Sequence, residues 1–166
     1  MRLKDIAWKE PAVSKVNSDA EILEFAVSKE IEAYHLYLAL ARHVASLKMR
    51  EVLESLAVEE LGHKQRLELE MMKSGRTVTS SQRPARPDSD YILSYSDGPL
   101  QMDLKDILLL GMQKEEASFR TYVSLIANIH EEETQELLLA LAEEEIRHKL
   151  RFEAEYNELL GQSADS

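Results

Sequence analysis

The sequence of 166 residues contains no cysteine. It can therefore form no disulfide, no cysteine-ligated iron–sulfur cluster and no zinc finger. Glycine (5) and proline (4) are scarce, which favours long helices over many short strands. No run approaches the roughly 18 apolar residues of a membrane helix, and the N-terminus has no apolar stretch of signal-peptide length. We therefore expect a soluble, cytoplasmic protein that does not associate with a membrane.

Basic residues are outnumbered by acidic ones. The chain has 31 Asp and Glu against 20 Lys and Arg, and its formal net charge is −11. Such a surface repels nucleic acid, so we expect no nucleic-acid partner. Hydrophobic residues make up 44% of the chain, which is enough for the core of one domain of ordinary size.

The chain contains the same segment twice. Residues 18–75 align without a gap on residues 103–160, an offset of 85, and 17 of the 58 pairs are identical. The identical pairs include Lys29 with Lys114, and the densest stretch reads LAVEELGHK in the first copy and LAEEEIRHK in the second. We interpret this as a duplication, because a shared helical composition would not align the rare histidines.

Each copy is expected to fold as two helices. A capping-box pattern opens the first copy at Ser18, with Glu21 three residues later, and Asp103 stands at the same place in the second. Apolar residues then recur at helical spacing. We expect the breaks and ends of the helices at four places: Ser46, Ser74 with Gly75 as the C-cap, His130 and Gly161.

The segment between the copies, residues 76–102, has a different composition and holds three of the four prolines. Helices of about 27 residues are about 40 Å long, so this linker could cross over along a whole bundle. A disordered tether is the alternative.

Trp8 could pack an N-terminal arm on the bundle or on a second subunit. The expected organisation is an arm at 1–17, a four-helix bundle at 18–160 with hairpins 18–75 and 103–160, and a tail at 161–166.

Ionisable residues interrupt the inward apolar stripe of each helix once, near its middle. The second and fourth helices each carry a Glu-x-x-His pair, whose two residues share one helix face. Glu30 and Glu60 lie at similar distances from the first hairpin turn, so they reach nearly the same height, and the second copy repeats this separation of 30 residues. The six residues are Glu30, Glu60, His63, Glu115, Glu145 and His148.

Four carboxylates at one level of an apolar bundle would repel one another and take up protons, and burying each one is costly. Arginine or lysine partners could offset the charge, but none is expected on these stripes at the same level. Two divalent cations could do so. Mixed oxygen and nitrogen ligands suit iron or manganese, and this ligand pattern is found in ferritin-like di-iron and di-manganese bundles. A degenerate copy of the fold with a buried hydrogen-bonded network is the alternative.

At these residues the chain resembles the ferritin-like superfamily and, within it, the rubrerythrin family. The resemblance covers about residues 18–160. It implies an all-α, ferritin-like four-helix bundle of two duplicated helical hairpins joined by a long crossover. It also implies two iron ions that Glu60 and Glu145 bridge, with Glu30 and Glu115 as terminal ligands and one histidine, His63 or His148, on each ion. The matching parts are Lys29-Glu30 with Tyr37, EELGH at 59–63, Lys114-Glu115 with Tyr122, and EEIRH at 144–148.

Three departures from the family pattern change what the resemblance implies. Rubrerythrins commonly carry a rubredoxin domain with a four-cysteine iron site, so a chain without cysteine needs a separate electron donor such as a rubredoxin. Rubrerythrins also tend to have a further Glu one turn after the third-helix ligand. Here Ser118 stands there and Glu116 points about 100° away from Glu115, so the sequence does not support peroxidase-type movement of iron. Bacterioferritins place a haem-binding Met where this chain has Leu61, so we expect no haem.

Tyr37 and Tyr122 lie seven residues after Glu30 and Glu115, two turns along the same face. We expect their hydroxyls to hydrogen-bond to ligand carboxylates and treat them as candidate catalytic residues. Plain core packing is the alternative. The remaining histidines are expected to be solvated or to cap helices: His35, His43 and His130.

The leading hypothesis is a non-haem di-iron oxidoreductase that reduces hydrogen peroxide, or oxidises ferrous iron with dioxygen or peroxide. A centre with manganese or mixed metals is a variant. The alternatives are iron binding or storage without redox turnover, and a structural protein on a retired di-iron fold. We expect a homodimer, in which helices could be exchanged between subunits.

Overall fold

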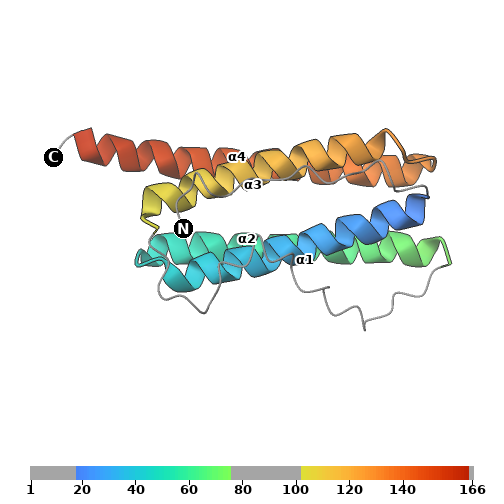
Figure 1. Ribbon diagram of the computed structural model, residues 1–166, viewed down its shortest axis with the longest axis horizontal. Helices are drawn as coiled ribbons and strands as arrows, with labels where there is room; N and C mark the ends of the chain where they lie inside the picture. The colour runs from blue at the N-terminus through green and yellow to red at the C-terminus, as the bar shows by residue number, and fades with distance from the viewer. Residues whose placement is uncertain (1–17, 76–101, 165–166) are drawn as a thin grey trace.

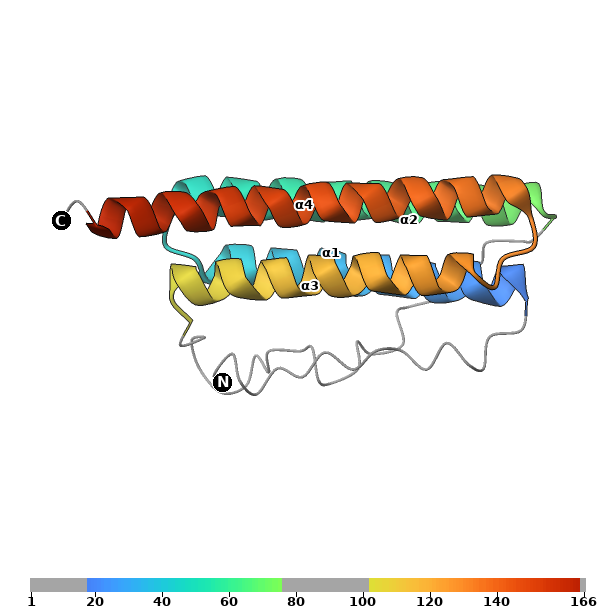
Figure 2. The same cartoon turned by 90° about the horizontal axis from the view of Figure 1, so that it is seen from above.

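The computed structural model describes residues 18–75 and 102–164, which form four helices. These are α1 (Asp19–His43), α2 (Leu47–Lys73), α3 (Leu104–Ile126) and α4 (Glu132–Ala164). Helix α1 packs antiparallel on α2 and α3 packs antiparallel on α4 (Figure 1). The two hairpins lie against each other so that α1 neighbours α3 and α2 neighbours α4 (Figure 2). The predicted all-α four-helix bundle is confirmed. Among the described residues we find no candidate for a membrane-spanning helix.

Side-chain caps begin three of the helices. Ser18 before α1 and Asp103 before α3 accept a hydrogen bond from the backbone amide three residues later, at 3.2 and 2.8 Å. Ser46 does the same before α2, at 3.2 Å. Each cap satisfies an amide that has no partner within its helix, and such a cap stabilises a helix by about 1 kcal/mol. The helix starts that the sequence predicts at Ser18 and Asp103, and the break near Ser46, agree with these positions.

Two helices end differently although each has a glycine near its C-terminus. Gly75 follows α2 with a φ of 80°, the left-handed conformation that closes a helix. Gly161 has no such φ, and α4 continues to Ala164. The last helix therefore ends beyond the expected position near Gly161, because Gly161 does not adopt the left-handed conformation that follows α2.

Helix α2 ends at one end of the bundle and α3 begins at the other (Figure 1). These are the two ends that the predicted long crossover would connect. Residues 76–101, the predicted N-terminal arm with Trp8, and residues 165–166 lie outside the described residues.

Asp19 connects the two hairpins at one end of the bundle. Its carboxylate accepts hydrogen bonds from the backbone amides of His130 and Glu131, at 3.1 and 3.0 Å. The ring Nδ1 of His130 lies 2.9 Å from the same carboxylate. Burial raises the pKa of Asp19, but these hydrogen bonds outweigh it and lower the pKa. A residue of α1 thus caps the start of α4. The His130 side chain is 81% exposed, so this residue is solvated, one of the two roles expected for it.

The apolar core is divided into two clusters, each built from all four helices. One contains Leu40, Leu53, Leu108 and Phe152, and the other contains Ile22, Leu67, Leu125 and Leu138. Each helix contributes residues to both clusters. The ionisable residues that interrupt its apolar stripe lie between its residues of one cluster and its residues of the other. A buried polar layer therefore separates two apolar regions.

Phe152 in α4 is fully buried and packs against Gly111 in α3. A Cβ at Gly111 would lie 2.6–2.7 Å from three atoms of the Phe152 ring, which is far below an ordinary contact. The same ring lies 5.8 Å from the ring of Tyr37. In the first copy the equivalent pair is Ala26 and Leu67. The copy with the larger apolar residue, Phe152, thus has the smaller partner, Gly111.

Candidate metal centre

The polar layer contains all six residues that the sequence predicts as metal ligands. The three glutamates Glu60, Glu115 and Glu145 are 0% exposed, and the other three residues are at most 3% exposed. Each of the four helices contributes at least one of them, so the layer is assembled only when both hairpins meet.

The six side chains form two overlapping groups. In each group one ligand atom from every residue lies within 4.8 Å of the others. Two glutamates belong to both groups, and each group has one further glutamate and one histidine. The first group is Glu30, Glu60, His63 and Glu145, and the second is Glu60, Glu115, Glu145 and His148.

The shared carboxylates turn one oxygen toward each group. Oε2 of Glu60 lies 3.3 Å from Nδ1 of His63, and Oε1 lies 3.3 Å from Nδ1 of His148. Oε1 of Glu145 lies 3.2 Å from Nδ1 of His63, while its Oε2 is on the other side. A carboxylate that divides its oxygens in this way can bridge two cations.

The two remaining glutamates each face one histidine. Oε2 of Glu30 lies 3.6 Å from Nδ1 of His63, and Oε2 of Glu115 lies 3.7 Å from Nδ1 of His148. The two imidazole rings are nearly parallel, with an angle of 6° and centroids 5.5 Å apart. The groups are thus related by the same pseudo-symmetry as the two copies.

Five buried atoms of this layer have no hydrogen-bond partner among the described residues. They are Oε2 of Glu60, both carboxylate oxygens of Glu145, and Nδ1 of His63 and of His148. Buried polar atoms are nearly always hydrogen-bonded, and leaving one without a partner costs about 1–3 kcal/mol. The five atoms belong to residues of the two ligand groups, where cations could satisfy them. Oxygen and nitrogen donors without sulfur suit iron or manganese.

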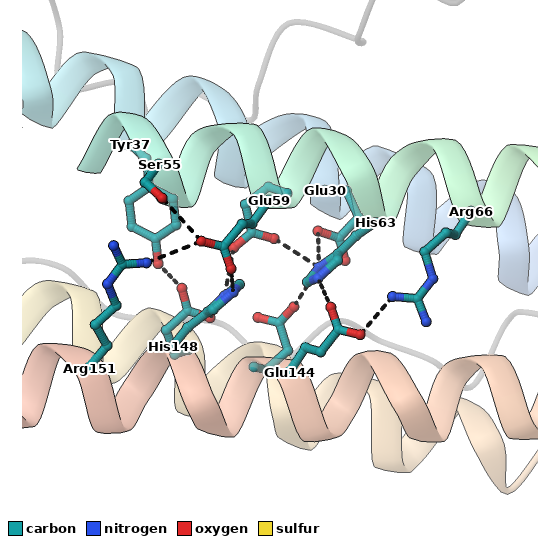
Figure 3. Close-up of polar contacts among 12 residues, drawn as sticks. Glu30, Tyr37, Ser55, Glu59, His63, Arg66, Glu144, His148 and Arg151 are labelled. Carbon is teal, nitrogen blue, oxygen red and sulfur yellow. Dashed lines mark hydrogen bonds and ion pairs between the residues drawn. The ribbon is translucent and has the colours of Figure 1, made fainter. Parts of the chain in front are cut away.

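A carboxylate from the opposite hairpin fixes the ring of His63. Its Nε2 lies 2.8 Å from Oε2 of Glu144, and Arg66 holds the other oxygen of Glu144 at 2.7 Å. When Nε2 donates its hydrogen to Glu144, Nδ1 presents a lone pair to the centre. Figure 3 shows this chain of contacts running from α2 to α4.

The second copy repeats the arrangement with the helices exchanged. Nε2 of His148 lies 3.0 Å from Oε2 of Glu59, and Arg151 contacts Glu59 at 3.1 Å (Figure 3). The inward stripe alone predicts neither these carboxylates nor the arginines, so the sequence-based prediction missed all four residues. The signal was present, since the two acids and the arginine three residues after each histidine are identical in the two copies.

Both tyrosines donate to a terminal glutamate across the bundle. The Tyr37 hydroxyl donates to Oε1 of Glu115, and the Tyr122 hydroxyl donates to Oε1 of Glu30. Burial and the neighbouring carboxylates raise the pKa of both phenols well above the ordinary value, so they remain donors. Each tyrosine therefore orients the terminal glutamate of the other copy, and its catalytic role stays a prediction.

Lys114 also reaches the centre, which the sequence-based prediction did not foresee because it considered only basic residues on the inward stripes. Its side chain is 7% exposed, and Nζ lies 3.2 Å from Oε1 of Glu60, 3.4 Å from Oε1 of Glu115 and 3.7 Å from Oε2 of Glu145. The residue is off the inward stripe, but its long stem carries the ammonium back into the layer. Its ammonium lies 5.0 Å from the ring centroid of Tyr37.

The pKa values of the ionisable groups in this layer are shifted in different directions. Burial and the charge of Glu60 raise the pKa of Glu30 to about 7. Burial also raises the pKa of Glu60, but the Lys114 ammonium and the histidines outweigh it and hold the pKa well below its usual range. Burial lowers the pKa of His148, but the facing carboxylates of Glu115 and Glu60 raise it to about 10. Cations that bind here have to displace protons from these groups.

Other polar residues near the layer do not belong to it. The Glu116 carboxylate pairs with Arg120 at 2.6 Å and with Lys149 at 2.9 Å, away from the centre. It therefore does not supply the further carboxylate that rubrerythrins tend to have on this helix. His35 and His43 are exposed.

The sequence and the fold were each similar to those of known proteins. A sequence model described as rubrerythrin matches residues 21–156. The bacterioferritin-related protein from Bacteroides fragilis, a dodecameric thioferritin, has 18% identity and a TM-score of 0.70, over 90% of this chain and 92% of that chain. A hypothetical protein from Pyrococcus furiosus has 23% identity and a TM-score of 0.65, over 98% of each chain. Comparison with curated proteins gave no significant match. These structural likenesses confirm the ferritin-like fold, and the buried glutamates and histidines fit the binding of iron.

Proposed function

Because the chain belongs to the rubrerythrin family, we propose that it is a non-haem di-iron oxidoreductase that reduces hydrogen peroxide or oxidises ferrous iron. The observation that carries the proposal is the pair of overlapping ligand groups that share Glu60 and Glu145. One ion would take Glu30 and His63 as its own ligands, and the other would take Glu115 and His148. Manganese in one or both positions is a variant of the same proposal.

The metal, when bound, supplies the electrons for reducing peroxide or dioxygen. The protein supplies the position of each ligand. Glu144 and Glu59 orient the two histidines from the opposite hairpin. The two apolar clusters on either side of the layer exclude bulk water, which strengthens the charge interactions inside.

Reduction of hydrogen peroxide to two water molecules consumes two electrons and two protons. This chain has no cysteine and so no rubredoxin-type iron site of its own. We therefore propose that a separate electron-donor protein, such as a rubredoxin, supplies the electrons.

The test is anaerobic loading with ferrous iron, followed by mixing with peroxide and optical stopped flow. We expect the loaded protein to react much faster than free ferrous iron. Glu60→Gln should slow the reaction to near the rate of free iron, because it removes a shared carboxylate charge. Glu70→Gln is the matched control: Glu70 is also a buried glutamate of α2, but it accepts from Thr134 and lies outside the centre. Loaded protein that reacts no faster than free iron would refute the proposal.

Iron storage is the second candidate, and the dodecameric neighbour from Bacteroides fragilis favours it. Storage predicts a large assembly and more than two iron atoms per chain. The oxidoreductase proposal predicts a homodimer, which exchange of helices could stabilise, with two metal ions per chain. Light scattering combined with elemental analysis of the same sample distinguishes them. A retired fold with a structural role predicts no transition metal, and little loss of stability in Glu60→Gln and Glu145→Gln.

A further inference from the structure

The two copies differ at one charged position beside the centre. Lys29 and Lys114 are equivalent in the duplication, and each directly precedes a proposed ligand. The side chain of Lys29 is 32% exposed, and its ammonium pairs with Glu32 at 2.9 Å. The side chain of Lys114 is 7% exposed and contacts three glutamates of the centre. The lysine side chain is therefore directed to the surface in the first half and into the centre in the second half.

The neighbours of each lysine explain the difference. Lys29 has Glu32 three residues later and the ring of Phe25 5.5 Å from its ammonium. In the second copy Ala117 replaces the glutamate and Leu110 replaces the phenylalanine. Neither can hold an ammonium, so the partners that keep Lys29 outside are lost. The carboxylates of the centre are the alternative partners of Lys114.

The Lys114 ammonium contacts the oxygens that are turned toward the second ligand group. Of the two shared carboxylates it approaches Oε1 of Glu60 and Oε2 of Glu145, and not the oxygens that face His63. It also lies 3.4 and 3.5 Å from the two oxygens of Glu115, the terminal ligand of that group. In the first group Glu30 instead contacts Tyr122 and His63.

We propose that Lys114 is an internal competitor for the second ligand group, so that the two metal positions have unequal affinities. A cation beside Glu30 and His63 binds without displacing the Lys114 ammonium, which does not contact the oxygens that face His63. A cation beside Glu115 and His148 binds only when the ammonium moves off their shared oxygens. The first position therefore fills first, and the second is the one where an ion exchanges more readily. The inference rests on the proposed metal centre and adds an order of filling to it.

The experiment is calorimetric titration of the full chain with Mn²⁺, which needs no turnover. Wild type should bind two ions in steps that differ by about tenfold or more, since a unit charge within 4–6 Å changes the binding of a proton by at least that factor. Lys114→Met should tighten the second step by about tenfold and leave the first unchanged. Lys29→Met is the matched control and should leave both steps unchanged. Crystals grown with one equivalent of Mn²⁺ should show the anomalous peak beside Glu30 and His63.

A second variant keeps the lysine and moves it. Ala117→Glu restores the partner that Lys29 has in the first copy, and residue 117 is only partly buried. It should draw the ammonium outward and tighten the second step although it deletes nothing. Gln113→Glu adds the same charge at an exposed position of α3 and should have no such effect. This pair remains informative if Lys114→Met does not fold.

The outcomes separate the two proposals. Two equal steps in wild type that neither Lys114→Met nor Ala117→Glu changes would overturn the role of Lys114 and leave the metal centre intact. A single equivalent of Mn²⁺ beside Glu115 and His148 would also overturn it. Absence of Mn²⁺ and Fe²⁺ binding in every folded variant would overturn the proposed function and, with it, this inference.

Discussion

Replacing Gly111 by alanine tests the packing that supports the centre. The substitution places a methyl group where the Phe152 ring now lies. That ring packs on Tyr37, and Tyr37 donates to Glu115. We therefore expect Gly111→Ala to destabilise the fold, although alanine is the better helix former.

The magnitude follows from two opposing terms. Alanine in place of glycine inside a helix is favourable by about 0.8–1 kcal/mol. The new Cβ would lie 2.6–2.7 Å from three ring atoms, whereas carbon atoms pack at about 3.5–4 Å, so the ring has to move by about 1 Å. Phe152 is fully buried, and overpacking of this kind costs about 1–3 kcal/mol. The expected net loss is about 1 kcal/mol.

Urea denaturation in the presence of a chelator measures this loss, and a melting curve should shift by about 2–4 °C per kcal/mol for a chain of this size. The double variant Gly111→Ala/Phe152→Leu installs the pair that the first copy has, Ala26 with Leu67. Phe152→Leu alone leaves a cavity and should also destabilise the fold. The double variant should lose about 1 kcal/mol less free energy of unfolding than the two single variants lose together, because the two residues are in contact.

Two results would refute this reasoning. Gly111→Ala at or above wild-type stability would mean that the Phe152 ring has room to move at no cost. Strict additivity in the double variant would mean that the two residues do not share the space between α3 and α4.

Three further predictions concern the centre and the contact between the hairpins. Glu144→Gln should weaken metal binding about tenfold to a hundredfold, because Glu144 orients His63; calorimetry checks this, and unchanged affinity would contradict it. Because the pKa of His148 is raised from 6.5 to about 10 in the fold, its protonation stabilises the metal-free protein fully below pH 6.5, and this contribution is lost as the pH rises through about 10. The free energy of unfolding measured with a chelator should therefore fall between pH 7 and pH 10, and a flat or rising profile would contradict it. Asp19→Ala removes the carboxylate that accepts from the His130 amide and should lower the free energy of unfolding by about 0.5–2 kcal/mol in urea denaturation. An unchanged free energy of unfolding would contradict the capping role of Asp19.

The fold could be predicted from the sequence because its determinants are local and occur twice. Ser18 and Asp103 mark helix starts by their side-chain chemistry, and the structure has caps at both. The interruption of each apolar stripe fixes the height of the polar layer, because rise per residue in a helix is constant. The end of α4 was not predictable in the same way, since Gly161 can continue a helix as well as end one.

The surroundings of the six predicted residues were harder to predict. Periodicity assigns a residue to a helix face, but it does not say where the end of a long side chain goes. Lys29 and Lys114 have the same register and opposite environments. Their neighbours differ, since Glu32 pairs with Lys29 and Ala117 stands at the equivalent position of the second copy, and only a comparison of the copies shows that difference. Glu59 and Glu144 were missed for a similar reason, because each acts across the bundle and not within its own helix.

The division of the ligands between the hairpins bears on how such a protein could arise. Each group takes three residues from one hairpin and a single glutamate from the other, so one hairpin alone completes neither group. Two identical hairpins paired about a twofold axis would complete both at once, and every substitution would then appear on both sides. Fusion into a single chain removes that constraint. A gene with two halves can alter one half alone, and Ala117 beside an inward-turned lysine is an asymmetry that no symmetric ancestor could have carried.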